Sequence, residues 1–397
     1  MALLASDTEA DAPADRMREL ARSVAGPGAA AVDRDGAFPA LTVAALRRER
    51  LLGLMVPEPL GGAGADLRTV ADLCAILAQS CGASAMIYAM HQIKLSSLVM
   101  HGQDSESHRQ LLRDVAARQL LIASSTTEAG IGGDLRTSLC AVEREGARFR
   151  LAKEASVISY GRMADVILAT ARRAPEAAGS DQVLVALRQG DYTLTPRGAW
   201  DTLGMRGTCS EGFLLRAEGD AAQIFPKPFH EIAAQSMLAT SHILWSSVWF
   251  GIAADAVRRA QAAVKAGLKK APPGAAPPGG LRLATAMRKL GEMKAMLGVS
   301  LDRYAAALGD EADLGALGFA IEMNALKVSS STLAVEIVQE ALLVTGLAGY
   351  RNDTPVSVGR HLRDVLSAPL MIANDRILAN TAALLPMSRF DTRLGTP

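Results

Sequence analysis

The stretch LIASSTTEAGIGGD, residues 121–134, decides how the rest of the sequence is interpreted. An apolar run passes directly into consecutive hydroxyl side chains, one glutamate and three glycines. This pattern is typical of a strand that ends in a loop whose backbone approaches a ligand, because glycine allows close contact. An ordinary glycine-rich turn has the same composition, so the segments around it must decide between the two interpretations.

Upstream of this stretch, the spacing of apolar residues predicts helices. Segments with a period near 3.6 are residues 14–25, 39–52, 65–80 and 84–100. Between two of them the segment GLMVPEPLGGAG, residues 53–64, holds two prolines and four glycines and is predicted as a loop. We therefore predict an all-helical N-terminal domain over residues 1–118.

Downstream of the stretch, the pattern changes to short runs of β-forming residues separated by glycine and polar turns. The runs are residues 148–151, 166–171, 182–187, 192–196 and 212–215. Such a sequence of short strands is typical of a small antiparallel barrel or sandwich. We predict a central β-domain over residues 119–226.

Helical spacing returns after the strands. Residues 229–266 predict a long core helix, and further helices are predicted at 281–308, 314–345 and 363–385. The proline-rich segment APPGAAPPGG, residues 271–280, is predicted as a stiff connector. The fold class is therefore α+β multidomain, with a C-terminal four-helix bundle over residues 227–397.

Composition narrows the classes of function. The chain has 397 residues, a net charge of +1 and 49% hydrophobic residues, so no basic surface for nucleic acid is indicated and a small-molecule ligand is expected. The four cysteines have no metal-ligand spacing, and no metal is expected. The first residues carry acids where a signal peptide would be basic, and no later run predicts a membrane span. We expect a cytoplasmic protein.

The ordered set of motifs resembles the acyl-CoA dehydrogenase superfamily over residues 16–385. Residues 126–134 resemble its Thr-Glu-x-Gly-x-Gly-Ser-Asp turn, and residues 53–64 resemble its Val-Pro-Glu-x-x-Gly-Gly-x-Gly loop. KEASVIS at residues 153–159 resembles the Lys-x-Trp-Ile-Thr segment, and TLGMRGT at residues 202–208 resembles the Leu-Gly-x-Arg-Gly-Ser/Thr turn. The family has the same order of helices, barrel and bundle.

The resemblance implies FAD as cofactor. Thr126 and Thr127 would meet the flavin ring, Ser159 would approach it from the neighbouring strand, and Gly133 would lie near the pyrophosphate or pantetheine. Val157 stands where the family usually has a tryptophan beside the flavin. The expected cofactor-binding residues are Ser124, Thr126, Thr127, Gly133, Val157 and Ser159.

The catalytic base of the family is not found at its usual place. The family uses a carboxylate to remove the α-proton of an acyl thioester while flavin N5 accepts the β-hydride. Downstream of the Arg363-Asp364 pair, Ile372 occupies the position of that glutamate, and the other known base position, around His242, has no carboxylate either. We consider Asp375 and His242 as catalytic candidates, although a solvated helix acid and a core histidine are the plainer interpretations. Gly133, His242 and Ile372 are the expected substrate-binding residues.

Four functions stay open from the sequence. The first is an acyl-CoA dehydrogenase-like enzyme acting on an acyl thioester of CoA or a carrier protein, with an electron-transfer flavoprotein or oxygen as electron acceptor. The others are a flavin monooxygenase or oxidase, a base-less partner subunit of a heteromer, and a non-catalytic acyl-binding module. Apolar residues on more than one face of the helix at 314–345 predict an oligomer, either a homodimer, a homotetramer or a heteromer.

Overall fold

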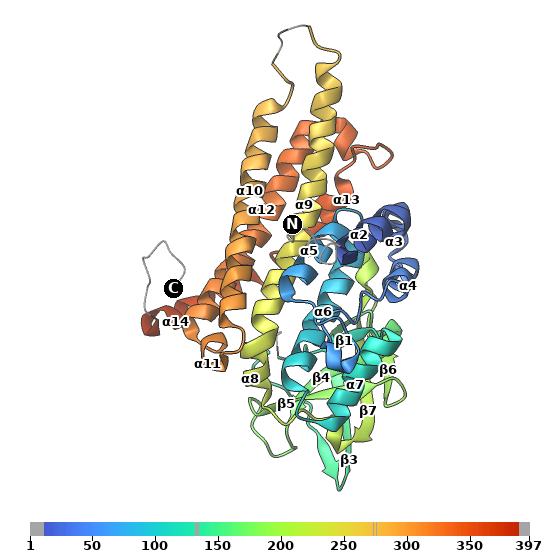
Figure 1. Cartoon of the computed structure of the whole chain (residues 1–397), viewed down its shortest axis with the longest axis vertical. Coiled ribbons are helices and arrows are strands. Elements are labelled where there is room, and N and C mark those ends of the chain that lie inside the picture. Colours follow the sequence, from blue (N-terminus) through green and yellow to red (C-terminus); the bar gives the residue numbers. More distant parts are fainter. Residues whose placement is uncertain (1–11, 132–134, 273, 275, 389–397) are drawn as a thin grey trace, which may run out of the picture.

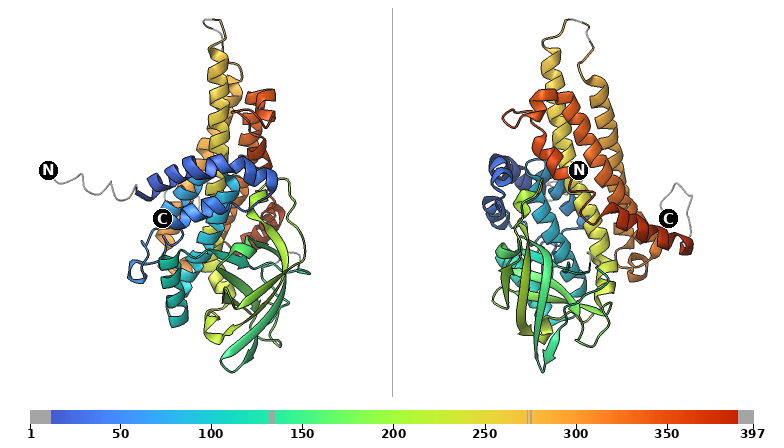
Figure 2. Two further views of the ribbon diagram at one scale, coloured as in Figure 1. Left: turned by 90° about the vertical axis from the view of Figure 1, so that its right-hand side faces the viewer. Right: turned by 180° about the vertical axis from the view of Figure 1, so that it is seen from behind.

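Helices, then strands, then helices follow one another along the chain, as Figure 1 shows for the computed structural model. The structure describes residues 12–131, 135–272, 274 and 276–388. The strands lie at one end of the molecule, and the long C-terminal helices extend to the other end in every view (Figures 1 and 2). The predicted order of helical region, small β-region and helical bundle is confirmed.

The N-terminal helices pack around α6, which spans Gly82–His101. Nearly every side chain of α6 is buried, because the helix lies between α5 and α9 and also contacts β1. The other elements are α2 (Ala12–Leu20), the π-helix η1 (Ala21–Ala25), α3 (Gly26–Asp35), α4 (Ala40–Arg48), η2 (Glu58–Leu60), α5 (Leu67–Ala78) and α7 (Glu106–Arg118). Helix α3 was not predicted from the sequence. Its proline lies in the first turn, where a missing N–H costs nothing.

Seven strands form two small sheets among the described residues. The strands are β1 (Ile122–Ser125), β2 (Glu143–Glu145), β3 (Arg148–Ser159), β4 (Val166–Arg172), β5 (Gln182–Arg188), β6 (Tyr192–Pro196) and β7 (Ser210–Asp220). One sheet has the order β1-β4-β5 and the other has the order β2-β3-β7-β6. Strand β1 pairs with β4 in parallel, whereas an antiparallel arrangement was expected throughout. This pairing brings the chain that leaves the N-terminal helices onto the edge of the first sheet.

The C-terminal region is built on three long helices. They are α9 (Leu238–Leu268), α10 (Gly280–Ala307) and α12 (Leu317–Tyr350), and each packs against the other two. Shorter elements are α8 (Phe229–Ile232), the π-helix η6 (Ala233–Met237), α11 (Glu311–Leu314), α13 (Gly359–Val365), α14 (Asn374–Leu384) and η7 (Leu385–Met387). Helices α9 and α10 join at the tip of the bundle through the segment that was predicted as a connector (Figure 1).

The last predicted helix, residues 363–385, is not continuous. Helix α13 ends at Val365 and α14 begins at Asn374, with turns between them. Pro369 lies in this interval, and a proline disfavours helical geometry at the residue before it. Ile372 then adopts a left-handed conformation with φ 52°. The predicted fourth helix is therefore replaced by two short helices, of which α13 contacts α9 and α12, and α14 contacts α12.

Among the described residues, two helices are long and apolar enough to cross a membrane by length and composition. The first, Phe229–Leu268, is 83% buried over its most apolar window, as expected of a core helix. The second, Leu317–Tyr350, is only 33% buried over that window in the single chain. Its exposed apolar side chains include Leu343, Leu347 and Tyr350.

Candidate functional site

The loop that follows β1 places two threonines next to β3. The Thr127 hydroxyl donates to the carbonyl oxygen of Val157 over 3.1 Å, and the hydroxyls of Ser124 and Thr126 lie 3.5 Å apart. Ser124, Thr126, Thr127, Val157 and Ser159 are all half-buried. The structure thus places Thr127 against Val157 and Ser124 beside Thr126, where β1 and the loop after it meet the end of β3. Gly133 lies outside the described residues.

Glu128 fixes the shape of this loop. Its side chain is buried and accepts hydrogen bonds from Ser138 Oγ at 2.8 Å, Leu139 N at 3.0 Å and Cys140 N at 2.7 Å. The buried Lys153 ammonium lies 3.9 Å away and donates to Thr170. Charge-assisted hydrogen bonds of this kind are stronger than neutral ones. The acid that the sequence places beside the threonines therefore anchors their loop and is not free for catalysis.

Strand β3 is irregular where it meets the loop. Its pairing with β7 shifts between Ala155 and Ile158, so Ser156 and Val157 have no register partner on β7. A bulge of this kind frees backbone groups from the ladder and is common next to active sites. One freed group, the Val157 carbonyl, receives the hydrogen bond from Thr127. The bulge therefore turns the backbone of β3 toward the threonine loop.

A chain of hydroxyl groups fixes Ser159. Its hydroxyl lies 2.7 Å from Ser210 Oγ, which lies 2.9 Å from Thr208 Oγ1, and that hydroxyl donates to Met205 O over 2.9 Å. Thr208 and its neighbours form the 3-10 helix η4, Arg206–Thr208. The Tyr160 hydroxyl, from the residue that follows β3, donates to Ile122 O over 2.9 Å. The ends of β1, β3 and β7 are thereby held in one arrangement.

His242 lies in the core helix α9 with its ring buried. Its Nδ1 is 3.0 Å from the carbonyl oxygen of Met323 on α12, so Nδ1 carries the proton and Nε2 is left as the acceptor. Burial lowers the pKa of His242 to about 4, against a smaller opposing effect of this hydrogen bond, and the nearby Lys327 lowers it further. The ring is therefore neutral at pH 7 and is a weak base.

The backbone carbonyl of Ile372 contacts a buried cation, Lys327. The Lys327 ammonium of α12 donates to Ile372 O and to Asn374 Oδ1, each over 2.7 Å, and it lies 5.8 Å from the ring centroid of Trp249. Burial lowers the pKa of Lys327 to about 8. A positive φ is rare for a β-branched residue and costs free energy, so the contacts to Lys327 hold Ile372 in this conformation. Lys327 was not predicted as a site residue.

Models of two domains of one family match the sequence. The acyl-CoA dehydrogenase N-terminal domain matches residues 7–119, and the acyl-CoA dehydrogenase C-terminal domain matches residues 232–383. The chain belongs to the acyl-CoA dehydrogenase family. The resemblance seen in the sequence is therefore confirmed at the level of the family and its fold.

Individual acyl-CoA dehydrogenase family relatives are distant. Cyclohex-1-ene-1-carbonyl-CoA dehydrogenase of Geobacter metallireducens is 24% identical over 383 residues, which cover 94% of this chain and 97% of that protein. The human mitochondrial short-chain specific acyl-CoA dehydrogenase is 25% identical over 355 residues, 87% of this chain and 82% of that protein. Among solved structures, FMN-bound TdsC from Paenibacillus sp. A11-2 superposes with a TM-score of 0.81 at 16% identity, covering 97% of this chain and 98% of that one. Another structure of TdsC describes it as a dibenzothiophene monooxygenase.

The three buried carboxylates of the described residues all have hydrogen-bond or ion-pair partners within the chain. The buried acids in the described part of the chain are Glu128, Asp255 and Asp364. Glu128 anchors its loop, Asp255 pairs with Arg258, Arg259 and His361, and Asp364 accepts from Met205 N over 2.7 Å. The candidate Asp375 is exposed in the first turn of α14. The described residues also contain no group of three or more His, Cys, Asp or Glu placed to hold a metal.

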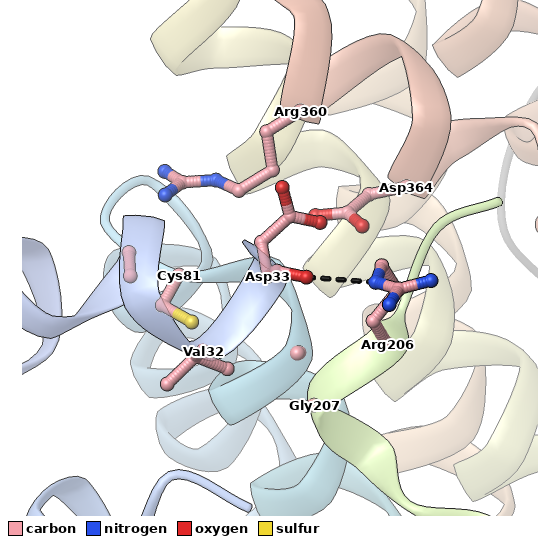
Figure 3. A pocket seen from close by; sticks show the side chains of 9 residues that line it. Val32, Asp33, Cys81, Arg206, Gly207, Arg360 and Asp364 are labelled. Atoms are coloured by element: carbon pink, nitrogen blue, oxygen red, sulfur yellow. Dashed lines mark hydrogen bonds between the residues drawn. The ribbon is translucent and has the colours of Figure 1, made fainter. Parts of the chain in front are cut away.

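A polar junction holds the Arg363-Asp364 pair upstream of Ile372. Figure 3 shows Asp33, Arg206 and Asp364 converging on a small cavity between α3, η4 and α13. Arg206 Nε donates to Asp33 O over 2.8 Å, and Arg363 forms an ion pair with the Asp33 carboxylate. Because Asp364 also binds the backbone of Met205, this junction connects the three regions of the chain. It fixes where the turn with Ile372 begins.

Proposed function

We propose that the chain is a flavin-dependent oxidoreductase that binds FAD and acts on the CH–CH group of an acyl thioester, attached to CoA or to a carrier protein. The observation that carries the proposal is the threonine loop after β1, which Glu128 holds against the bulge of β3. The family and its named dehydrogenase relatives support this class of reaction.

The residues present fit a flavin ring. Hydroxyl groups of Thr126, Thr127 and Ser159 and backbone groups of the bulge are the donors and acceptors that a polar heterocycle needs. The Ser125 hydroxyl is buried without a hydrogen-bond partner in the structure. Val157 replaces the usual tryptophan and offers aliphatic surface in its place. When bound, a flavin supplies hydride transfer, and the protein supplies orientation and electrostatics.

The opposite wall would be formed by α9 and by the turn that carries Ile372. Ile372 takes no proton, and His242 is neutral with a lone pair on Nε2 and a pKa of about 4. A resident general base typically contributes about 10² to 10⁴ in rate. We therefore expect oxidation of simple saturated acyl thioesters to be slow in this chain alone.

The second candidate function is a flavin monooxygenase or oxidase. It is favoured by Lys327, a buried cation next to the position where the family has an anion. A cation in a site of low dielectric stabilises negative charge that develops nearby, which suits reactions with oxygen. The similarity to TdsC, described as a monooxygenase, agrees with this alternative.

We also propose that α12 packs against another copy of the chain in a homodimer or homotetramer. Leu343, Leu347 and Tyr350 are exposed on it, at 58%, 75% and 72%. An exposed apolar surface of this kind marks a site of association. Light scattering that gives a monomer at micromolar concentration would refute this arrangement. A heteromer with a base-supplying partner would be recognised by activity that appears only when that homologue is added.

The test of the reaction class is an anaerobic titration of the flavin-loaded protein. Acyl-CoA thioesters of increasing length are added while the visible absorbance of the flavin is followed. Slow bleaching by thioesters supports the dehydrogenase proposal. If no thioester bleaches the flavin, and the chemically reduced protein consumes oxygen faster in the presence of a substrate, the monooxygenase proposal replaces it. A protein that binds thioesters but no flavin would be an acyl-binding module.

A further inference from the structure

Lys94 is a buried lysine near the middle of α6. The residue is 5% exposed, and its described hydrogen-bond partner is the thioether sulfur of Met237, 3.3 Å from Nζ. A thioether is a weak acceptor, whereas an ammonium group has three donors. The other buried lysines, Lys153 and Lys327, each donate to two oxygen atoms. Lys94 is thus left with unused donors.

No counter-charge among the described residues compensates Lys94. Its pKa falls from 10.5 to about 7, and burial alone accounts for the change. A buried amine without an oxygen partner costs free energy in either protonation state, and more when it is charged. A ligand could supply the missing partner, because ligand-binding sites are lined by apolar residues with a few polar groups that contact the ligand.

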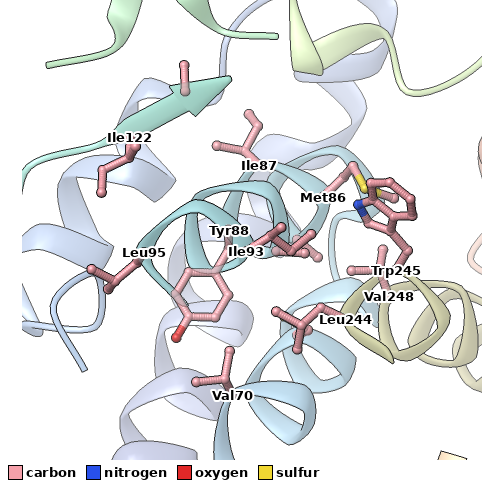
Figure 4. Packing of buried hydrophobic residues seen from close by; sticks show 14 of the residues in the cluster. Val70, Met86, Ile87, Tyr88, Ile93, Leu95, Ile122, Leu244, Trp245 and Val248 are labelled. Carbon is pink, nitrogen blue, oxygen red and sulfur yellow. The ribbon is translucent and has the colours of Figure 1, made fainter. Parts of the chain in front are cut away.

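The position of Lys94 on α6 connects it with the start of α9. Met86, Met90 and Lys94 are spaced by four residues and lie on one face of α6. Helix α6 packs against α9, Met86 and Trp245 belong to the same packed cluster in Figure 4, and Lys94 contacts Met237, the last residue of η6. This face of α6 therefore runs along the turns of α9 that carry His242.

The same segment of α6 also contacts the strand that leads into the threonine loop. His91, three residues before Lys94, accepts a hydrogen bond at Nδ1 from Ile122 N of β1 over 3.0 Å. On the other side, Ser97 Oγ lies 2.9 Å from Ser236 Oγ in the π-helix η6. Single π-turns are frequent at functional sites. Lys94 thus lies among the elements that carry the proposed flavin and substrate site.

We propose that Lys94 determines substrate specificity by binding a carboxylate, or another anionic oxygen group, at the end of the substrate remote from the reacting carbons. The inference rests on the proposed function, since it places the substrate between α6 and α9. A methyl-ended acyl chain would leave the amine without a partner, and a site that leaves a buried polar group unpaired discriminates against that ligand. A carboxylate would satisfy both the charge and the free donors of Lys94.

The test compares two thioesters of equal length on the flavin-loaded full chain. Adipoyl-CoA carries a terminal carboxylate and hexanoyl-CoA ends in a methyl group. Dissociation constants are measured from the change of the flavin spectrum. The wild type is expected to bind adipoyl-CoA roughly 30-fold more tightly or better, which is the low end of the loss when one partner of a buried charged pair is removed. Lys94→Met should reverse the preference.

Lys227→Met is the matched control. Lys227 pairs with Gln235 of η6 over 3.0 Å and with Glu311 over 2.8 Å, near the same helix but with its own partners. This variant should keep the wild-type ratio. The proposal is overturned if the wild type binds hexanoyl-CoA as tightly as adipoyl-CoA, or if Lys94→Met leaves the ratio unchanged.

A second measurement tests anion binding at Lys94 independently of the proposed function. If neither thioester binds, the proposed function fails, and free hexanoate is compared with 1-hexanol by their effect on melting temperature. Stabilisation by hexanoate in the wild type but not in Lys94→Met supports anion binding at Lys94. Equal effects of the two compounds, or equal effects on both proteins, overturn it. The methionine variant has a suitable volume and should fold, because it removes an uncompensated buried amine.

Discussion

Replacing Ile372 with glutamate restores a carboxylate at the base position of the family, and the structure sets the surroundings of this group. The Lys327 ammonium lies 2.7 Å from the carbonyl oxygen of residue 372. An opposite charge within about 4 to 6 Å lowers a carboxyl pKa by about 1 to 3 units, whereas burial raises it. Because Lys327 opposes the effect of burial, we expect the new carboxylate to be ionised and able to accept a proton at pH 7.

The size of the effect follows from general-base catalysis. A positioned base contributes about 10² to 10⁴ in rate, which corresponds to roughly 3 to 5 kcal/mol in the barrier. The cost to folding is smaller. Ile372 is half-buried, so losing its apolar surface costs on the order of 1 to 2 kcal/mol, and an unbranched glutamate is less strained than isoleucine at φ 52°. The variant should therefore fold and gain activity.

The assay is anaerobic bleaching of flavin absorbance by butyryl-CoA in a rapid-mixing instrument. Ile372→Glu should be reduced at least about 100-fold faster than the wild type. Ile372→Gln, which has the same shape without the base, should stay slow. The reasoning is refuted if the glutamine variant matches the glutamate variant. It is also refuted if the wild type is already fast and loses its rate in His242→Ala or Asp375→Asn, since the base would then have moved.

Three further predictions concern groups that the structure holds in place. Glu128→Gln removes one acceptor from three converging donors and also removes the counter-charge of Lys153. Urea denaturation should show a free energy of unfolding lower by about 1 to 3 kcal/mol. Unchanged stability would contradict the anchoring role. Burial raises the pKa of Asp364 from 3.8 to about 6, so wild-type stability should fall by up to about 3 kcal/mol as pH rises from 4 to 6; Asp364→Asn should abolish this slope. Burial lowers the pKa of Lys94 to about 7. Wild-type stability should therefore fall by on the order of 3 to 5 kcal/mol as pH drops from about 10 to 7, and should then level off. The pH profile of Lys94→Met should lack this fall.

Much of the fold could be predicted because its signals are local. The period of apolar residues located α5, α6 and α10 to within two residues of their ends, and the β-type runs located β4, β5 and β6 to within one. It also located α9 and α12, but the predicted ranges 229–266 and 314–345 begin or end several residues away from the observed helices. The parallel pairing of β1 with β4 could not be predicted, since it joins residues more than 40 positions apart, such as Ile122 with Val166. Helix α3 was missed because its glycines and proline outweighed the alanines in the pattern. The break before α14 depends on the left-handed turn at Ile372, which the sequence does not indicate.

In the candidate site, too, the residues that belong to local motifs could be predicted, whereas the roles that depend on tertiary contacts could not. The order of the motifs predicted Thr126, Thr127, Val157 and Ser159 as site residues, and the structure places the Thr127 hydroxyl against the Val157 carbonyl. The roles of Glu128 and Lys327 depend on partners distant in sequence, residues 138–140 for the first and 372–374 for the second. The sequence carried one usable signal for Lys94 and Lys327. Each is a single lysine within a long apolar helix, where a charged residue on the buried face is unusual.

The central claim is that a flavin binds at the threonine loop beside the bulge of β3. The most direct measurement is FAD binding by wild type and by Thr127→Val, followed by visible absorbance and by melting temperature, with Thr193→Val as a control in the exposed strand β6. The wild type should be yellow, and FAD at a hundredfold excess over its dissociation constant should stabilise it by about 2.7 kcal/mol. Thr127→Val should bind FAD more weakly, and Thr193→Val should bind it like the wild type. A colourless wild type that added FAD neither colours nor stabilises, or equal binding by all three proteins, would contradict the claim.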